Sequence, residues 1–174
     1  MECKKERAVL VPGSFGPVTK GHEDLIKKAC LLGDKVYVTA MVNPRKTTLF
    51  PVEKRVEWLK KVCSKYPSVT VDFYQGMLVD YARQKGIFLI VKGVRNGEDF
   101  LYEKEMAEYN DKNAGTLTVF LPAGEGLEQV SSTAVRQALA ETGEGLYLPD
   151  EIAREVVAFS RKKILTKTEK NSIM

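Results

Sequence analysis

The sequence predicts a single α/β domain in which helices cover both faces of a doubly wound, parallel five-stranded sheet. Short apolar segments alternate with segments of helical periodicity through most of the 174 residues. The short segments are apolar on both faces, as is typical of parallel strands buried between two layers of helices. No internal repeat or linker interrupts the alternation, and a chain of this length is expected to form one domain.

The early elements set the pattern. Strand 7–11 runs directly into a loop rich in glycine and proline. Helix 21–32 carries apolar side chains along one face from Leu25 to Leu32, and Gly33 is expected to end it. In order, the expected elements are strand 7–11, helix 21–32, strand 35–41, helix 52–63, strand 69–73, helix 77–84, strand 88–91, helix 98–110, strand 117–121, helix 131–141 and helix 149–163.

Local signals support the later elements. Pro51 stands where the first position of helix 52–63 is expected. Gly86 is expected to end helix 77–84, and strand 88–91 is apolar throughout. Hydroxyl side chains cluster at the start of helix 131–141, where they can cap it.

The composition excludes several classes of protein. Hydrophobic residues make up 44% of the chain and charged residues 29%, as in soluble globular proteins. No apolar run approaches the roughly 18–20 residues that a membrane-spanning helix needs, and the start resembles no signal peptide. The cysteines are widely spaced, which fits reduced thiols: Cys3, Cys30 and Cys63. We therefore expect a cytoplasmic protein with no membrane partner.

The net charge of +4 lies at the C-terminal end. Residues 160–174 contain five basic residues and one acidic residue, which leaves 22 of each in the rest of the chain. A nucleic-acid-binding protein would carry its basic residues as a patch on the fold. We expect a domain over residues 1–160, a solvated basic tail over 161–174, and no nucleic-acid partner.

Four polar or glycine-rich segments follow predicted strands: 12–22, 43–50, 92–99 and 122–133. The carboxyl ends of parallel strands meet at one edge of a sheet, and ligands bind there where the strand order reverses. These segments are therefore the candidate site.

Segment 12–22, PGSFGPVTKGH, predicts an anion site at a helix N-terminus. It is not a P-loop, because His22 stands where the lysine should be, and no strand is followed by G-x-G-x-x-G. His22 is the only histidine. A lone histidine is more often structural, but its place behind this loop favours a role in the site. Ser14, by residue type alone, is a turn residue or helix cap.

The other segments supply cations and hydroxyls. Arg45 and Lys46 fit a solvated loop or a phosphate contact equally well. Lys92 and Arg95 follow a buried strand, where cations are costly without an anionic partner. Glu103, on the helix that follows them, is by residue type solvated or paired. The hydroxyls at 131–133 either cap a helix or hold a triphosphate, with Arg136 one turn on.

Three motifs carry a resemblance to a known family. The strand followed by PGSFGPVTKGH resembles the (T/S)-x-G-H motif of the nucleotidyltransferase superfamily, and SSTAVR at 131–136 resembles its I-S-S-T-x-(I/V)-R motif. The block KGVRNGEDFLYEKEMAEYN at 92–110 resembles one found in bacterial phosphopantetheine adenylyltransferases. The resemblance extends from about residue 8 to about residue 158.

The resemblance implies a Rossmann-like nucleotidyltransferase fold and a reaction. The adenylyl group of ATP would pass reversibly to 4'-phosphopantetheine, giving dephospho-coenzyme A and pyrophosphate, the penultimate step of coenzyme A biosynthesis. It also implies Mg²⁺ held by the ATP phosphates without protein ligands, a homohexamer, and inhibition by coenzyme A.

The resemblance also assigns roles to residues. His22 would stabilise the transition state. The substrate-binding residues would be Ser14, Lys46, Leu78 and Lys92. The ATP-binding residues would be Ser14, Phe15, His22, Gly93, Val94, Arg95, Glu103, Leu127, Glu128, Gln129, Val130, Ser131, Ser132 and Thr133.

Two positions depart from the family. Gly16 stands where an Asp is usual, and Lys92 where an Arg is usual; lysine keeps the charge but not the two-pronged geometry. The alternatives are another small-substrate enzyme of the superfamily, such as a nicotinate mononucleotide adenylyltransferase or a glycerol-phosphate cytidylyltransferase, and a non-catalytic nucleotide-binding relative. Gly16 is the departure that fits a relative that has lost activity.

Overall fold

The computed structural model of the chain describes residues 6–45 and 48–171, with side chains described through residue 163. Its sheet has five strands in the order β3-β2-β1-β4-β5, and every neighbouring pair is parallel. The strands are β1 (Ala8–Gly13), β2 (Lys35–Val42), β3 (Val69–Gln75), β4 (Leu89–Val94) and β5 (Leu117–Pro122). The helices are α1 (Lys20–Ala29), α2 (Val52–Cys63), α3 (Leu78–Lys85), α4 (Gly97–Ala114), α5 (Ser132–Glu141) and α6 (Ala153–Asn171). The predicted fold class is confirmed.

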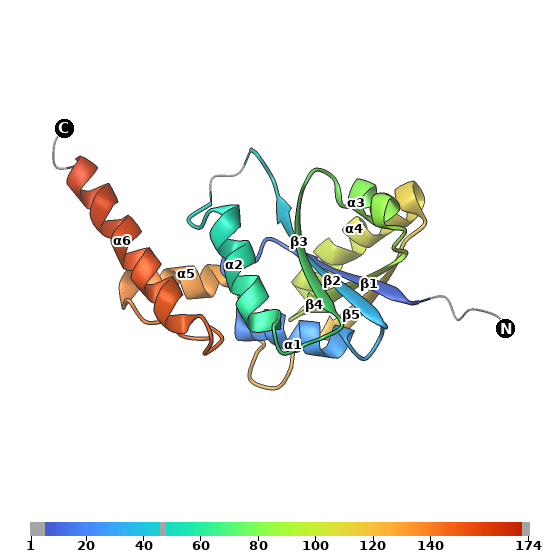
Figure 1. Ribbon diagram of the computed structural model, residues 1–174, viewed down its shortest axis with the longest axis horizontal. Coiled ribbons are helices and arrows are strands. Elements are labelled where there is room, and N and C mark those ends of the chain that lie inside the picture. Colours follow the sequence, from blue (N-terminus) through green and yellow to red (C-terminus); the bar gives the residue numbers. More distant parts are fainter. Residues whose placement is uncertain (1–5, 46–47, 172–174) are drawn as a thin grey trace.

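The strand order explains why both faces of the sheet are covered. The chain moves outward from β1 to β3 and then returns to β4, so right-handed crossovers place α1 and α2 on one face and α3 and α4 on the other. Figure 1 shows α3 and α4 together on the side of the sheet away from α1. The order reverses beside β1, which is where such sheets bind ligands.

Alternation along β1 divides the core between the two faces. Val9 and Val11 belong to the larger cluster of buried residues, with Ile26 of α1 and Trp58 of α2. Leu10 points the other way and belongs to a second cluster, which includes Tyr81 of α3 and Ile90 of β4. Burial on both faces is the reason that this strand has no polar positions.

The structure corrects several predicted boundaries. Helix α1 ends at Ala29, four residues before Gly33, and its C-cap is Cys30. Gly33 instead allows the backbone to pack closely against Val9, because a Cβ at residue 33 would lie 2.4 Å from Cγ2 of Val9. Phe88 precedes β4 and is 55% exposed, so the apolar run begins outside the strand.

The last helix also differs from the prediction. Helix α6 begins at Ala153 and not at Pro149, because residues before it form turns. It continues to Asn171, past residue 160, where the tail was expected to begin, and Figure 1 shows its distal end extending away from the sheet. The division of the chain at residue 160 stays a prediction. None of the helices in the described part of the chain is long and apolar enough to cross a membrane.

Candidate functional site

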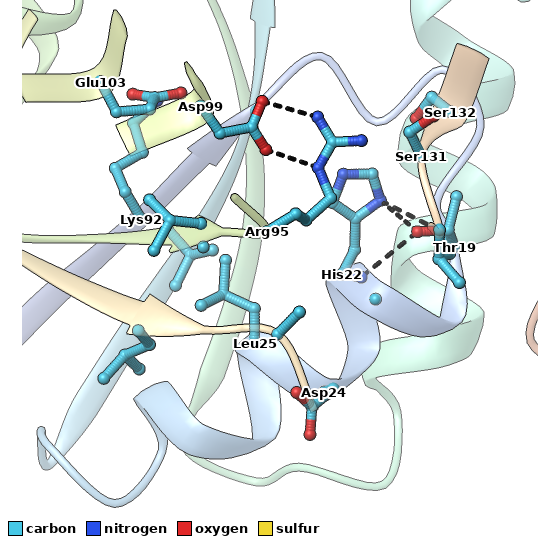
Figure 2. Close-up of a pocket in the computed structure, with 18 of the residues that line it drawn as sticks. Thr19, His22, Asp24, Leu25, Lys92, Arg95, Asp99, Glu103, Ser131 and Ser132 are labelled. Atoms are coloured by element: carbon cyan, nitrogen blue, oxygen red, sulfur yellow. Dashed lines mark hydrogen bonds and ion pairs between the residues drawn. The ribbon is translucent and has the colours of Figure 1, made fainter. Parts of the chain in front are cut away.

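A pocket of about 550 Å³ opens at the carboxyl ends of β1 and β4. Its walls come from the loop after β1, the first turns of α1 and α4, and the start of α5 (Figure 2). The pocket therefore lies beside β1, where the strand order reverses. A concave pocket of this size with a few convergent polar groups is suited to a small molecule.

Most of the predicted site residues line this pocket. They are Ser14, Phe15, His22, Leu78, Lys92, Gly93, Val94, Arg95, Glu103, Leu127, Val130, Ser131 and Ser132. The pocket lining does not include Glu128, Gln129 or Thr133. Lys46 lies outside the described residues. The tertiary structure thus brings together residues from four segments that are far apart in the sequence.

The pocket also contains residues that the sequence did not single out, among them Met41, Asp99 and Tyr102. Asp99 had a usable signal, because it follows Arg95 by four residues at the start of a predicted helix, a spacing at which opposite charges can pair. Met41 and Tyr102 had none. Apolar and aromatic residues of their kind also occur at ordinary core and surface positions.

His22 has a fixed position and a defined tautomer. It is the third residue of α1 and shares a capping box with Thr19. The backbone N–H of Thr19 donates to Nδ1 of His22 at 3.1 Å, and the N–H of His22 donates to Oγ1 of Thr19 at 3.3 Å. Because Nδ1 accepts, the proton of the neutral ring is on Nε2. Figure 2 shows that edge of the ring turned toward Arg95.

The imidazole of His22 is neutral at physiological pH. Desolvation of the ring, and then the positive charge of Arg95, lower the pKa of His22 from 6.5 to about 4. The edge of the Phe15 ring packs against the imidazole at 4.9 Å between ring centroids. A neutral Nε2–H that is held in place by its neighbours can donate a hydrogen bond without passing on its proton.

The predicted anion site at the start of α1 is largely used by the protein itself. The N–H of Lys20 donates to the carbonyl of Tyr147 at 2.8 Å, and that of His22 donates to Thr19. Among the first three residues of the helix, this leaves only the N–H of Gly21 without an acceptor in the described part of the chain. The anion site expected over residues 12–22 stays a prediction, with the N–H of Gly21 as the donor that this first turn leaves free.

The start of α5 has more free donors. Ser131 caps the helix by accepting from the N–H of Ala134 at 3.0 Å, so its capping alternative is confirmed. The N–H groups of Ser132 and Thr133 have no acceptor among the described residues. Free N–H groups and the helix dipole make this end suitable for an anion.

The glycine-rich loop is held by side chains of α5. Arg136 donates to the carbonyl of Gly16 at 2.6 Å and to Oγ1 of Thr133 at 2.9 Å. Ser132 donates to the carbonyl of Pro17 at 2.8 Å. Arg136 is not among the residues that line the pocket, and its guanidinium supports the loop.

Both pocket cations are paired with carboxylates of α4. Nζ of Lys92 lies 3.1 Å from Oε2 of Glu103. Arg95 forms a two-pronged pair with Asp99, with Nε–Oδ2 and Nη2–Oδ1 distances of 2.6 and 2.8 Å (Figure 2). The pairing meets the expectation that cations at this strand end need anionic partners. A phosphate that enters the pocket must share these cations with the two carboxylates.

The described residues form no group of three or more His, Cys, Asp or Glu side chains that could hold a metal ion. Mg²⁺ often enters sites with the phosphates of its nucleotide and keeps several waters. Such an ion needs no dedicated protein cage, so these residues fit it.

The chain matches the cytidylyltransferase-like family over residues 10–138. It is 37% identical over 151 residues to a phosphopantetheine adenylyltransferase of Streptomyces coelicolor, covering 87% of this chain and 95% of that one. It is 39% identical to one from Caldanaerobacter subterraneus, covering 90% and 99%. A bifunctional NMN adenylyltransferase/ADP ribose pyrophosphatase from Francisella tularensis is similar in structure, with a TM-score of 0.59, 15% identity, and coverage of 79% of this chain and 42% of that one.

Proposed function

The chain belongs to the phosphopantetheine adenylyltransferase family, and we propose that its pocket transfers the adenylyl group of ATP to 4'-phosphopantetheine. The products are dephospho-coenzyme A and pyrophosphate, and the reaction is reversible. The observation that carries this proposal is identity of 37–39% to enzymes of that name over at least 87% of the chain. Residues of the three sequence motifs meet around one pocket, which gives the proposal a physical basis.

The chemistry needs no nucleophile from the protein. A phosphate monoester has a second pKa of about 6, so the phosphate of 4'-phosphopantetheine is largely a dianion at pH 7. One of its oxygens forms a bond to the α-phosphorus of ATP, and the bond from that phosphorus to the bridging oxygen of pyrophosphate breaks. Pyrophosphate leaves with the electron pair, and no proton has to move. The barrier comes from charge repulsion and from alignment.

The pocket residues are suited to lowering that barrier. His22 lies between Arg95 on one side and Ser131 and Ser132 on the other (Figure 2). We assign its Nε2–H to an oxygen of the α-phosphate, where negative charge grows in the transition state. The free N–H groups at the start of α5 are assigned to the β- and γ-phosphates. Lys92 is assigned to the phosphate of 4'-phosphopantetheine.

Mg²⁺ is proposed to enter with ATP. It would offset part of the phosphate charge, and it would lessen the competition between the phosphates and the carboxylates of Asp99 and Glu103 for the cations. Product-like coenzyme A is proposed to bind the same pocket as an inhibitor. A cytoplasmic location is proposed with them, because ATP and the coenzyme A pathway are found there.

We further propose that the protein assembles into a homohexamer through surfaces that include α4. Of the 18 residues of this helix, only Asn110 is buried. Its exposed large side chains include Phe100, Leu101 and Tyr102, with exposures of 41%, 63% and 64%. Such a concentration of apolar surface on one helix is typical of an interface. Sedimentation equilibrium tests this: a monomer at micromolar concentration would contradict it.

The function is tested by measuring pyrophosphate release with Mg²⁺, ATP and 4'-phosphopantetheine. Parallel reactions contain ATP with nicotinate mononucleotide, or CTP with glycerol phosphate. Release with 4'-phosphopantetheine alone is the expected result. Release only in another reaction would overturn the substrate. Binding of ATP with no release in any reaction would indicate a non-catalytic relative.

A further inference from the structure

Arg55 of α2 is a buried cation directly behind the glycine-rich loop. Its side chain is part of a residue only 3% exposed, and its Nη1 donates to the carbonyl oxygen of Ser14 at 2.6 Å. Its Nε is buried and has no hydrogen-bond partner. Within the described residues, no carboxylate lies within ion-pair distance of Arg55, whereas both pocket cations have one.

Glu53 attracts this charge from beyond ion-pair distance. A buried charge with no carboxylate in contact is still expensive, so its retention needs a reason. Burial lowers the pKa of Arg55, but an arginine stays protonated at physiological pH. The positive charge therefore persists next to the loop. Its only hydrogen-bond partner among the described residues is the carbonyl of a pocket residue, Ser14.

That hydrogen bond orients the next peptide group. The Ser14–Phe15 peptide is trans, so its N–H points opposite to its C=O. Because the carbonyl of Ser14 faces Arg55 on α2, the N–H of Phe15 faces away from α2. This N–H has no acceptor among the described residues, and Ser14 and Phe15 both line the pocket.

The conformation of Phe15 shows that the turn is held under strain. Its φ is +46°, a left-handed value that is unfavourable for a residue with a side chain, and such strain persists only when the surroundings impose it. The residue is 1% exposed, with its ring against His22. The bond from Arg55 is one restraint that imposes this turn.

We propose that Arg55 is a positioning residue for adenylyl transfer, which presents the Phe15 N–H to a substrate phosphate and adds positive potential at that point. The proposal rests on the proposed function for the identity of the reaction. Binding of the anion does not depend on that function, because any phosphate in the pocket would meet the same Phe15 N–H and the same positive potential of Arg55. Inorganic pyrophosphate, a product of the reaction, is therefore a suitable probe.

The first test compares Arg55→Met and Arg55→Lys with wild type. Lys54→Met is the matched control, because it removes one positive charge from the same helix at a half-exposed position that pairs with Glu57. Calorimetry measures pyrophosphate binding, and pyrophosphate release gives kcat and KM. For Arg55→Met we expect binding about tenfold weaker and kcat at least tenfold lower. Arg55→Lys should recover part of both, and the control should match wild type.

The second test adds a counter-charge by Gly16→Asp. A Cβ at residue 16 would lie 3.6 Å from Cδ of Arg55, an ordinary contact, so the new carboxylate has room beside the guanidinium. Neutralising Arg55 should raise the melting temperature while weakening pyrophosphate binding severalfold. These opposite signs would not arise from a merely structural role. In the Arg55→Met background the same change should no longer stabilise the protein.

The outcomes separate the two proposals. A wild-type protein that binds pyrophosphate but forms no product would overturn the proposed function. The role of Arg55 would then be decided by the pyrophosphate affinity of its variants. A folded Arg55→Met variant with wild-type pyrophosphate affinity and kcat would overturn the role of Arg55. If Arg55→Met does not fold, unchanged binding in both Arg55→Lys and Gly16→Asp would overturn it instead.

Discussion

Lowering the pH from 8 to 5 should destabilise the fold through His22. The pKa of this residue is 6.5 in an ordinary environment and about 4 in the folded protein. Below pH 6.5 the imidazole of His22 is protonated in the unfolded chain, whereas in the folded protein it stays neutral down to about pH 4. Stability from this group is therefore complete above pH 6.5 and is lost as the pH falls from 6.5 toward 4.

The size of the effect follows from the shift. One pKa unit corresponds to about 1.36 kcal/mol, so the interval from pH 6.5 to pH 5 gives about 2 kcal/mol as an upper value. The ring lines an open pocket, and solvent there screens part of the effect. We therefore expect the free energy of unfolding to change by about 1–2 kcal/mol on account of His22.

The assay compares wild type with His22→Gln by urea unfolding at pH 8 and pH 5. Glutamine is chosen because its side-chain oxygen can accept from the N–H of Thr19 and keep the capping box. Other titrating groups contribute to both proteins and cancel in the difference. The stability of wild type relative to the variant should fall by about 1–2 kcal/mol between the two pH values. An unchanged difference would refute the assignment.

The same pKa can be observed directly. His22 is the only histidine, so one imidazole signal in the NMR spectrum of the folded protein reports it without ambiguity. It should titrate near pH 4 with the Nε2–H tautomer. Arg95→Met should raise the pKa, because the charge of Arg95 helps to lower it. Lys27→Met, on the exposed side of α1, is the matched control; titration near 6.5 in wild type would refute the reasoning.

Three further predictions concern the site and the core. His22→Ala should lower turnover by about 10²–10³, the usual cost of one such donor, and wild-type turnover would remove His22 from the mechanism. Lys92→Arg should lower the KM for 4'-phosphopantetheine severalfold, because a guanidinium can hold Glu103 and a phosphate at once. An unchanged KM would mean that the two-pronged geometry of arginine is unimportant at this position. Gly33→Ala should cost about 1–3 kcal/mol in urea unfolding, because its Cβ would lie 2.4 Å from Val9, whereas Gly97→Ala has open space and should cost nothing; equal stabilities would contradict this.

The fold was predictable because its signals are local. A strand buried on both faces must be apolar throughout, and Leu89–Val91 show this in the sequence itself. Gly86, a glycine in the αL conformation, ends α3 as expected. Helix α4 continues past its expected end at residue 110 to Ala114, where Gly115 is the αL C-cap. Gly33 misled the prediction because close packing against Val9, and not a helix end, requires a glycine there.

The members of the site were predictable, but their partners were not. Motif spacing singled out His22, Arg95 and the serines at the start of α5, and all of them line one pocket. The N–H of Lys20 at the start of α1, for example, donates to the carbonyl of Tyr147, more than a hundred residues away in the chain. No local pattern carries that contact.

The sequence by itself determined the order of elements, the parallel sheet and the segments that meet at its carboxyl edge, because periodicity and turn residues act over short distances. Only the tertiary structure decided which groups are neutral, paired or left without a partner. Burial and the charge of Arg95 set the pKa of His22, and packing of α2 against the loop left Arg55 with no carboxylate at ion-pair distance among the described residues. Those properties depend on desolvation and on distances between segments, which exist only after the chain has folded.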